Sequence, residues 1–380
     1  MEKDHLVFVF CNHNDIWFDR LRTKNPIVIS YVKGRLRDTP FVSAYRALRE
    51  SAFSVCTAPV YRWQKRGAII VNYHGVSPPL TDPDIAIHVP PDLFRKQIRH
   101  LKTYYKVVSL AELLDSLEAG YSIPSNWAVL TFDDGFRNNL TYAWQILREE
   151  GAIPISLFII TDFIGTNNVF WGDLIPLVVM CCRNQMLRVP CDENSWELRP
   201  LHTRRQREFL GIEIVDVLKS IPENKRQPIL DEFFLQFGTG EIDEIRSRSS
   251  YYNSLSWDEV RFLHSNGVDV GSHTRTHAYM RPELGLKRMQ EEIFGSREKI
   301  REELGKAPDH FCYPNGTRDD FCELSGRLLR EAGYRCGLTT VLGTVQNSAD
   351  PFELRRQIHI SSMARFRTVV AAGKQHYRNF

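Results

Sequence analysis

Residues 127–135 read Trp-Ala-Val-Leu-Thr-Phe-Asp-Asp-Gly, and this stretch decides the expected fold. Its first six residues are apolar apart from one threonine, which is typical of a short buried strand. The run passes directly into two carboxylates, Asp133 and Asp134, and then into a glycine. A turn explains this ending on its own, since Asp and Gly are common turn residues. The two neighbouring carboxylates repel each other, however, and a bound cation would relieve that repulsion.

Strand-like and helix-like segments alternate on both sides of this stretch. Further strands are expected at residues 67–73, 107–110, 154–160, 269–272, 311–313 and 335–338. Helices are expected between them, at residues 91–102, 111–117, 139–150, 256–267, 282–304 and 320–332. Such alternation predicts a parallel α/β architecture in which the functional site lies at the carboxyl ends of the strands.

The chain has 380 residues, a length at which one large domain or two smaller ones are both ordinary. Residues 1–66 contain no cluster of chemically suggestive side chains, and we expect them to form an N-terminal extension of unknown role. The alternating segments predict one domain at residues 67–362, followed by a C-terminal tail at 363–380. Charged helical segments at about 165–253 interrupt the alternation, which predicts a helical insertion within the domain.

The composition restricts the classes of partner. The chain has 49 basic and 46 acidic residues and a net charge of +3, too little to indicate nucleic-acid binding through bulk charge. No apolar run approaches the roughly 18 residues of a membrane span. The first residues lack the apolar core and cleavage site of a signal peptide, so we expect a cytoplasmic protein whose eight cysteines are free thiols.

Two later motifs also follow predicted strands. Residues 271–277, Gly-Ser-His-Thr-Arg-Thr-His, place two histidines four positions apart, and residues 311–316 read Phe-Cys-Tyr-Pro-Asn-Gly. Alone, the first is a common chance pattern and the second a turn. Together with the two carboxylates they predict a site in which one Asp and two His hold a divalent metal with one position left open for water. The second Asp would act as a general base, which predicts metal-assisted hydrolysis.

These three motifs, in this order and each at a strand end, resemble those of the polysaccharide deacetylase family (NodB homology, carbohydrate esterase family 4). The resemblance covers roughly residues 67–360 and implies a distorted (β/α) barrel, usually with seven parallel strands. Members hydrolyse N-acetyl groups of amino sugars and, less often, O-acetyl groups or cyclic amides. The resemblance implies a divalent metal cofactor, zinc in the first place, with cobalt or another divalent ion as alternatives.

The resemblance also implies roles for individual residues. Asp133 falls on the general base of the family, and Asp134, His273 and His277 fall on its metal ligands. Tyr313 falls on the position whose backbone N–H helps to stabilise the oxyanion, a task that fixed donors perform in many hydrolases.

Two positions depart from the family pattern. Many members have an arginine that pairs with the base, whereas this chain has Cys312 near that place, so Arg355 or Arg356 is the expected substitute. For the acid that protonates the leaving amine, two histidines compete. His74 resembles the acid of a branch that includes the biofilm poly-N-acetylglucosamine deacetylases, and His359 lies where the family's late motif is expected. We favour His74, because it follows a strand and opens a loop.

The sequence therefore predicts a metal-dependent hydrolase that removes an N-acetyl group from an amino sugar or glycan precursor and releases acetate. Its partner would be an N-acetylated sugar or glycan, with no nucleic acid and no membrane span. One alternative is a hydrolase of the same fold that acts on a cyclic amide or an O-acetyl ester. Another is a catalytically silent glycan-binding protein, which Cys312 favours and the retained Asp133 argues against, because metal binding alone does not require that carboxylate.

Overall fold

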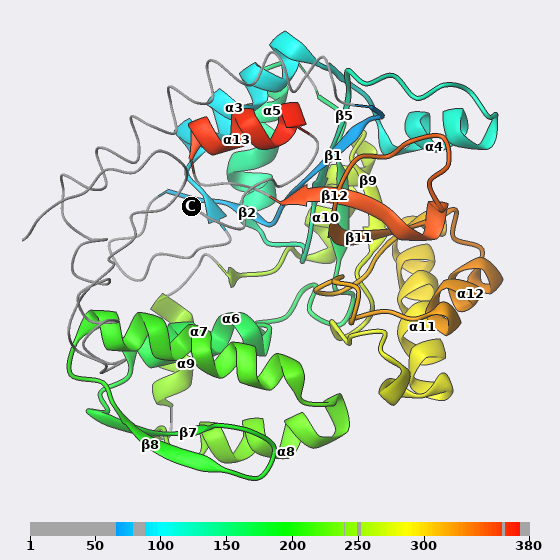
Figure 1. The fold of residues 1–380 in the computed structure, drawn as a ribbon. Helices are drawn as coiled ribbons and strands as arrows, with labels where there is room; N and C mark the ends of the chain where they lie inside the picture. Colours follow the sequence, from blue (N-terminus) through cyan, green and yellow to red (C-terminus); the bar gives the residue numbers. More distant parts are fainter. Residues whose placement is uncertain are drawn as a thin grey trace, which may run out of the picture.

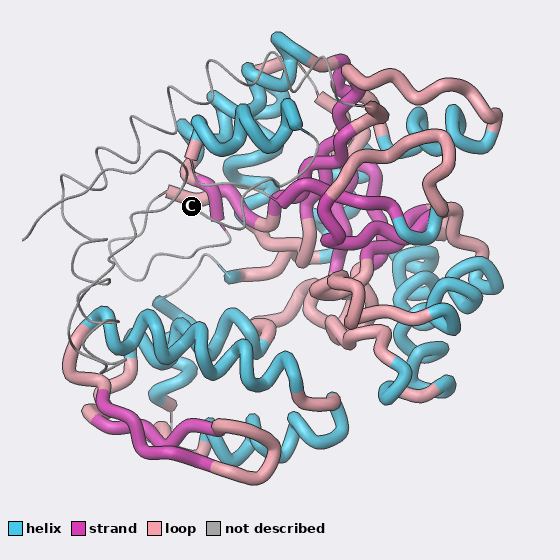
Figure 2. The backbone as a smooth tube through the Cα atoms, in the orientation of Figure 1, coloured by secondary structure: helices cyan, strands magenta, loops and turns pink. Residues whose placement is uncertain are grey.

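The computed structural model contains a closed barrel of seven parallel strands surrounded by helices (Figures 1 and 2). The structure describes residues 66–78, 88–151, 153–238, 240–248, 252–358 and 362–372. The predicted extension at 1–66 (apart from its last residue) and His359 therefore lie outside the described residues. The predicted α/β barrel is confirmed.

The barrel strands run in one direction, so their carboxyl ends meet at one mouth. In order around the barrel they are β1 (Ile69–Tyr73), β12 (Leu354–Ile358), β11 (Cys336–Leu342), β10 (His310–Cys312), β9 (Asp269–Ser272), β6 (Ser156–Ile159) and β5 (Trp127–Phe132). Pairing of β5 with β1 closes the ring, in a register from Ile69 opposite Ala128 to Tyr73 opposite Phe132. A short strand, β4 (Lys106–Val107), extends the sheet beside β5.

Alternate residues along the strands enter different hydrophobic clusters, as expected for a barrel. Ile70 and Val129 belong to one cluster with Cys312 and Leu338 from the opposite strands. Their sequence neighbours, such as Leu130, belong to a second cluster with apolar side chains of the surrounding helices. Each such buried aliphatic side chain contributes about 1.5–3 kcal/mol, so this two-sided burial is what selects strand structure here.

Helices connect the strands, and several boundaries differ from the sequence-based expectation. The outer helices are α3 (Pro91–Tyr104), α4 (Leu110–Glu118), the π-helical turn η1 (Asn139–Trp144) with α5 (Gln145–Glu149), α10 (Trp257–Ser265), η3 (Pro282–Leu284), α11 (Leu286–Leu304), α12 (Glu323–Ala332) and η4 (Pro351–Glu353). The helix predicted at 282–304 is broken at Gly285, whose φ of 78° no helix accommodates. The capping box at Ser256 and Glu259 forms as expected.

Residues 165–253, which we call the insertion segment, lie between β6 and β9 in the chain and appear in green in Figure 1. The segment contains α6 (Trp171–Cys181), β7 (Met186–Pro190), β8 (Trp196–Pro200), α7 (Arg204–Ser220), α8 (Glu223–Phe234) and α9 (Glu241–Arg248). Its apolar side chains form their own cluster, which also takes in Phe136 from the barrel. The antiparallel hairpin of β7 and β8 was not expected in a region predicted to be helical.

Residues 363–372, expected to belong to a tail, form the helix α13 (Met363–Ala372). The helix buries Phe366, and the carbonyl of Val370 accepts a hydrogen bond from the Tyr105 hydroxyl at 2.9 Å. It therefore lies against the barrel near α3 (Figure 1). Within the described residues, no helix is both long and apolar enough to cross a membrane, and six cysteines are free thiols.

Candidate active site

The motif residues meet at the carboxyl ends of the barrel strands. Asp134 is the second residue after β5, His277 lies in the loop after β9, and Asn315 lies in the turn after β10. Together with Thr274 these are the only non-glycine residues of the described chain with positive φ, at 57–72°. That backbone conformation costs energy for such residues, and its concentration at one end of the barrel marks a functional site.

Asp134, His273 and His277 form a compact buried group. The Asp134 Oδ1 atom lies 3.5 Å from His273 Nε2 and 3.6 Å from His277 Nε2. One ligand atom from each residue can be chosen so that all three lie within 4.8 Å of one another. A carboxylate and two imidazoles are a donor set that zinc accepts, and three protein ligands leave a coordination position open for chemistry.

The electrostatics of this group also fit a cation. Burial lowers the pKa of both His273 and His277, so the imidazoles are held neutral, the form that binds metals. Burial, followed by the charges of Asp173 and Asp133, raises the pKa of Asp134 well above its usual value. The buried Oδ1 atom of Asp134 accepts no hydrogen bond from any residue that the structure describes. A divalent ion would compensate this carboxylate, so the residues present fit a metal.

The backbone of β10 orients one of the two histidines. The His273 Nδ1 atom lies 2.8 Å from the carbonyl oxygen of Cys312, which only a protonated Nδ1 can contact as a donor. Its Nε2 atom is therefore the unprotonated nitrogen, and it faces Asp134. Metal-binding histidines are commonly fixed by such a hydrogen bond.

Asp133 forms a two-pronged ion pair with Arg356. The Nη1 and Nη2 atoms of Arg356 donate to the two carboxylate oxygens at 2.9 and 2.8 Å. Arg356 also donates to the Thr131 hydroxyl at 3.2 Å and to the Thr339 carbonyl at 2.8 Å, and its side chain is fully buried. Of the two arginines expected from the sequence, Arg356 is thus the partner, whereas Arg355 is exposed.

The charge of Arg356 controls the protonation of Asp133. Burial alone would raise the pKa of this carboxyl group, but the charge of Arg356 and its hydrogen bonds outweigh burial and hold the pKa below its usual range. Asp133 is therefore ionised at neutral pH, as a general base must be.

Cys312 fills the space beside this ion pair. Its Sγ atom lies 3.7 Å from both oxygens of Asp133 and 3.1 Å from Arg356 Nη2, and burial raises the pKa of the thiol well above its usual value. Cys312 could form a second ligand group with Asp133 and His273. Arg356 already occupies both oxygens of Asp133, so the group around Asp134 is the better metal site.

His74 lies at the same end of the barrel, directly after β1. It is close enough to Asp133 and His277 for its charge to lower the pKa of both. His74 therefore lies within electrostatic reach of the predicted base and of a predicted metal ligand. Its competitor His359 lies outside the described residues.

The structure does not support the role predicted for the Tyr313 backbone N–H. Its backbone N–H donates to the Leu338 carbonyl at 3.0 Å, so this donor is already used between the strands. Its ring is buried and stacks on Phe321 with centroids 4.7 Å apart. The N–H of Asn315, two residues later in the turn, has no acceptor in the described part of the chain and is the better candidate for an oxyanion donor.

The insertion segment adds a carboxylate that no motif indicated. Burial raises the pKa of Asp173 to about 7, with the charge of Lys219 opposing. Its charge raises the pKa of Asp134. No sequence pattern pointed to Asp173, because an acidic residue in the first turn of a helix is ordinary.

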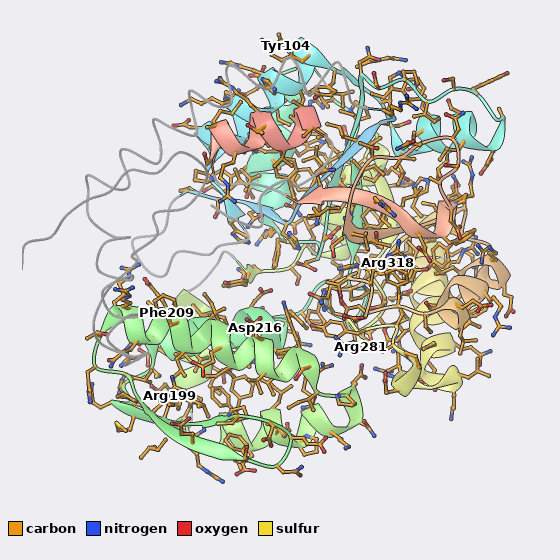
Figure 3. The ribbon with its side chains drawn as sticks, viewed as in Figure 1. Tyr104, Arg199, Phe209, Asp216, Arg281 and Arg318 are labelled. Atoms are coloured by element: carbon orange, nitrogen blue, oxygen red, sulfur yellow. The ribbon has the colours of Figure 1, made fainter. Side chains whose placement is uncertain are left out.

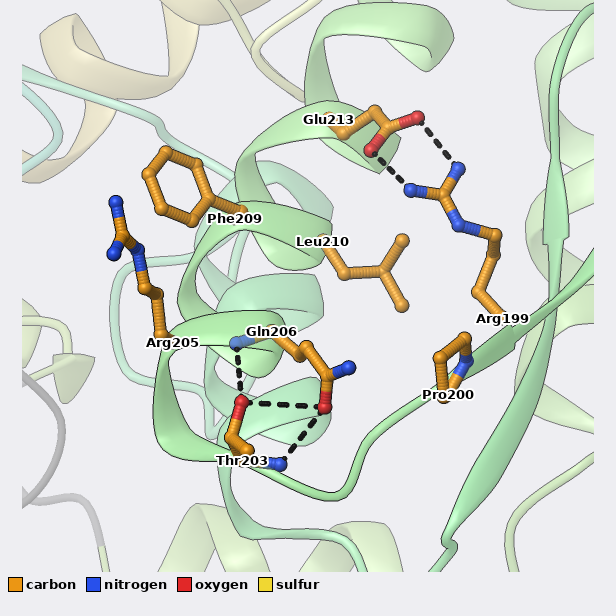
Figure 4. A pocket seen from close by; sticks show the side chains of 8 residues that line it. All are labelled: Arg199, Pro200, Thr203, Arg205, Gln206, Phe209, Leu210 and Glu213. Carbon is orange, nitrogen blue, oxygen red and sulfur yellow. Dashed lines mark hydrogen bonds and ion pairs between the residues drawn. The ribbon is translucent and has the colours of Figure 1, made fainter. Parts of the chain in front are cut away.

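Two pockets lie away from the polar cluster at the barrel mouth. A pocket of about 310 Å³ lies between β8 and α7, where Arg199 pairs with Glu213 at 2.9 Å (Figure 4). A second pocket of about 260 Å³ lies next to α12. Of the predicted site residues only Tyr313 lines either pocket, so the functional assignment rests on the polar cluster at the barrel mouth.

Comparisons with known proteins agree with this geometry. A family model described as polysaccharide deacetylase matches residues 122–337. The deacetylase PplD of Streptococcus pyogenes, solved in complex with acetate, is 14% identical over 82% of this chain and 99% of that chain, with a TM-score of 0.52. IcaB from Ammonifex degensii is 16% identical over 81% of this chain and 97% of that one, with a TM-score of 0.51. The search of curated proteins finds no match.

Proposed function

The chain belongs to the polysaccharide deacetylase family, and we propose that it is a metal-dependent hydrolase that removes an N-acetyl group from an amino sugar or glycan precursor and releases acetate. The observation that carries this proposal is that two neighbouring carboxylates have different surroundings. Asp134 lies against two neutral histidines, while Asp133 is kept ionised by Arg356. One carboxylate is suited to bind a metal and the other to accept a proton.

Asp134, His273 and His277 would hold the divalent ion, for which zinc is our first choice. A metal at this position lowers the pKa of a water molecule and polarises a carbonyl group. Asp133 would then accept a proton from the attacking water, because Arg356 keeps this carboxylate ionised and holds both its oxygens in place. We assign the Asn315 N–H to the oxyanion that forms at the acetyl carbon.

His74 would protonate the departing amine. Proton delivery is needed because an amine leaves poorly as an anion, and a histidine titrates in the range that such a donor requires. His74 lies within electrostatic reach of both Asp133 and His277. Replacing it with Gln should reduce turnover strongly and leave the metal content unchanged. Full activity of that variant would reject this assignment.

The substitution of arginine by Cys312 no longer favours a silent glycan-binding protein. The guanidinium that the base requires comes from β12 instead, in a fully buried ion pair. Burying such a pair costs free energy, because both charged groups lose their contact with water. A chain that keeps the pair despite this cost is expected to use the charge on Asp133. This argument supports an active hydrolase.

Acetate release from a panel of N-acetylated sugars and oligosaccharides tests the proposal. Zinc-loaded and cobalt-loaded protein would be compared with Asp133→Asn, which keeps the size of the side chain and removes the base. The panel should include an O-acetyl ester and a cyclic amide. Release of acetate from the N-acetylated members by the wild type, and not by Asp133→Asn, supports the proposal. Turnover confined to the ester or the cyclic amide would replace it with the alternative hydrolase.

A further inference from the structure

The second histidine ligand lacks the hydrogen bond that orients the first. His273 is fixed through its Nδ1 atom by the carbonyl of Cys312. The Nδ1 atom of His277 is buried and has no hydrogen-bond partner among the described residues. His277 also has a φ of 65°, a conformation that costs energy for a residue with a side chain. Something other than a hydrogen bond must therefore hold its ring in place.

An aromatic ring from the insertion segment makes the closest ring contact to His277. The ring of Phe170 lies 4.1 Å from the imidazole, centroid to centroid, with the planes inclined by 52°. The other ring neighbours, His273 and Tyr279, lie farther away, at 4.9 and 6.1 Å. Phe170 directly precedes α6, so a segment outside the barrel strands covers a ligand of the proposed metal.

The local sequence is adapted to this contact. A Cβ atom on Gly172 would lie 2.4 Å from Cε1 of Phe170, far closer than atoms can approach. Glycine at position 172 therefore leaves the space that the Phe170 ring occupies, although glycine weakens a helix. Any larger residue there must displace the ring. The φ angle of Gly172 is not positive, so the backbone conformation does not explain the glycine.

The insertion segment is also fastened to the loop that carries His277. The guanidinium of Arg226, in α8, lies 4.8 Å from the ring of Trp171 and 5.1 Å from the ring of Tyr279. Arg281, labelled in Figure 3, donates to the Lys219 carbonyl at 2.7 Å. These contacts fix the start of α6, and with it Phe170, relative to the metal-binding loop.

We propose that Phe170 is a positioning residue for His277, so that the insertion segment sets the affinity of the site for its metal. This inference rests on the proposed function only in requiring a metal at His277. Residues that orient metal-binding histidines typically change metal affinity by about 10–100-fold when they are removed. We expect an effect of that size for Phe170→Ala.

The test measures zinc affinity by competition with a chelating dye, together with the visible spectrum of the cobalt-loaded protein. Phe170→Ala should bind zinc about 10–100-fold more weakly and shift the cobalt bands, because one ligand is no longer held in one orientation. Phe170→Tyr retains the ring and should restore most of the affinity. The inference would be overturned if Phe170→Ala had the zinc affinity and the cobalt spectrum of the wild type.

Gly172→Ala provides a second variant should Phe170→Ala fail to fold. Alanine favours a helix more than glycine does, but its Cβ would displace the Phe170 ring, so Gly172→Ala should weaken zinc binding. The matched control is Gly326→Ala in α12, where the nearest atom to an added Cβ lies 3.7 Å away. Equal zinc affinity for Gly172→Ala and Gly326→Ala would contradict the inference. If the wild type bound no divalent ion, the proposed function would fail as well. Failure of the proposed function is thereby distinguished from failure of the inference on Phe170 alone.

Discussion

Replacing Arg356 with methionine removes the partner of Asp133 while keeping most of the side-chain volume. Both members of the pair are buried, with 0% and 3% of their side chains exposed. Removing one member of a buried ion pair costs about 3–5 kcal/mol, because the other charge is left without compensation. The bonds from Arg356 to Thr131 and Thr339 disappear as well. We therefore expect Arg356→Met to lower the free energy of unfolding by about 3–5 kcal/mol.

The assay is urea unfolding of the metal-free protein, with Arg355→Met as the matched control. Arg355 is exposed, and its replacement should change stability by no more than about 0.5 kcal/mol. In the double variant with Asp133→Asn, no charge remains to be compensated, so the cost of losing Arg356 should fall. The pKa of Asp133 is lowered in the folded state, so its stabilising effect is present at neutral pH and is lost as the pH falls through that folded-state pKa. A cost below about 1 kcal/mol for Arg356→Met would refute this account of the pair.

Three further predictions concern the metal and two carboxylates. Zinc at about 100 times its dissociation constant should stabilise the wild type by about 2.7 kcal/mol. The same zinc concentration should stabilise His277→Ala much less, and an equal gain in stability would place the metal elsewhere. Asp269 has a lowered pKa because His310, hydrogen-bonded at 2.5 Å, outweighs burial, so it contributes stability that is lost as the pH falls through its folded-state pKa. Asp269→Asn should therefore cost about 1 kcal/mol at neutral pH and nothing in strong acid, and a cost that is independent of pH in thermal unfolding would contradict this. Burial raises the pKa of Asp173 to about 7 in the folded state, so the metal-free protein loses stability as the pH rises from about 4, where the unfolded chain ionises, to about 7. Asp173→Asn should therefore be the more stable form at about pH 9 and equal to the wild type at about pH 4, whereas equal stability at both would refute the assignment.

The sequence was sufficient for the parts of the site that lie next to strands. The bounds of β5 and β9 agree with the expected 127–132 and 269–272, because both are short buried runs that end in polar residues. Parallel strands bring their carboxyl ends together, so Asp134, His273 and His277 had to meet once the barrel was correct. Local sequence and topology together therefore predict the metal group.

Contacts that depend on register were harder to predict. Arg355 and Arg356 are neighbours on β12, and only the pairing of that strand decides which one faces the barrel interior. A shift of one residue exchanges the two sides of a strand. The same difficulty affects the turn after β10. There the N–H of Tyr313 is used between strands, and the N–H without an acceptor among the described residues belongs to Asn315.

The insertion segment was the least predictable part. Its hairpin strand β7 buries Leu187 and Val189, but charged neighbours and a terminal proline obscured the alternation. The contact between Phe170 and His277 joins residues more than a hundred positions apart, and nothing in either local sequence indicates it. Such contacts arise from how a connecting segment folds back on the barrel, which periodicity does not encode.

The most direct test of the central claim is to count both products of the reaction. With the best N-acetylated substrate of the panel and zinc-loaded protein, acetate and new free amine would be measured in the same samples. We predict that the two appear in equal amounts with the wild type, and that Asp133→Asn yields neither while still binding zinc. Equal acetate and amine from Asp133→Asn, at the wild-type rate, would contradict the assignment of Asp133 as the base. Zinc-bound wild type that releases neither product would contradict the deacetylase itself.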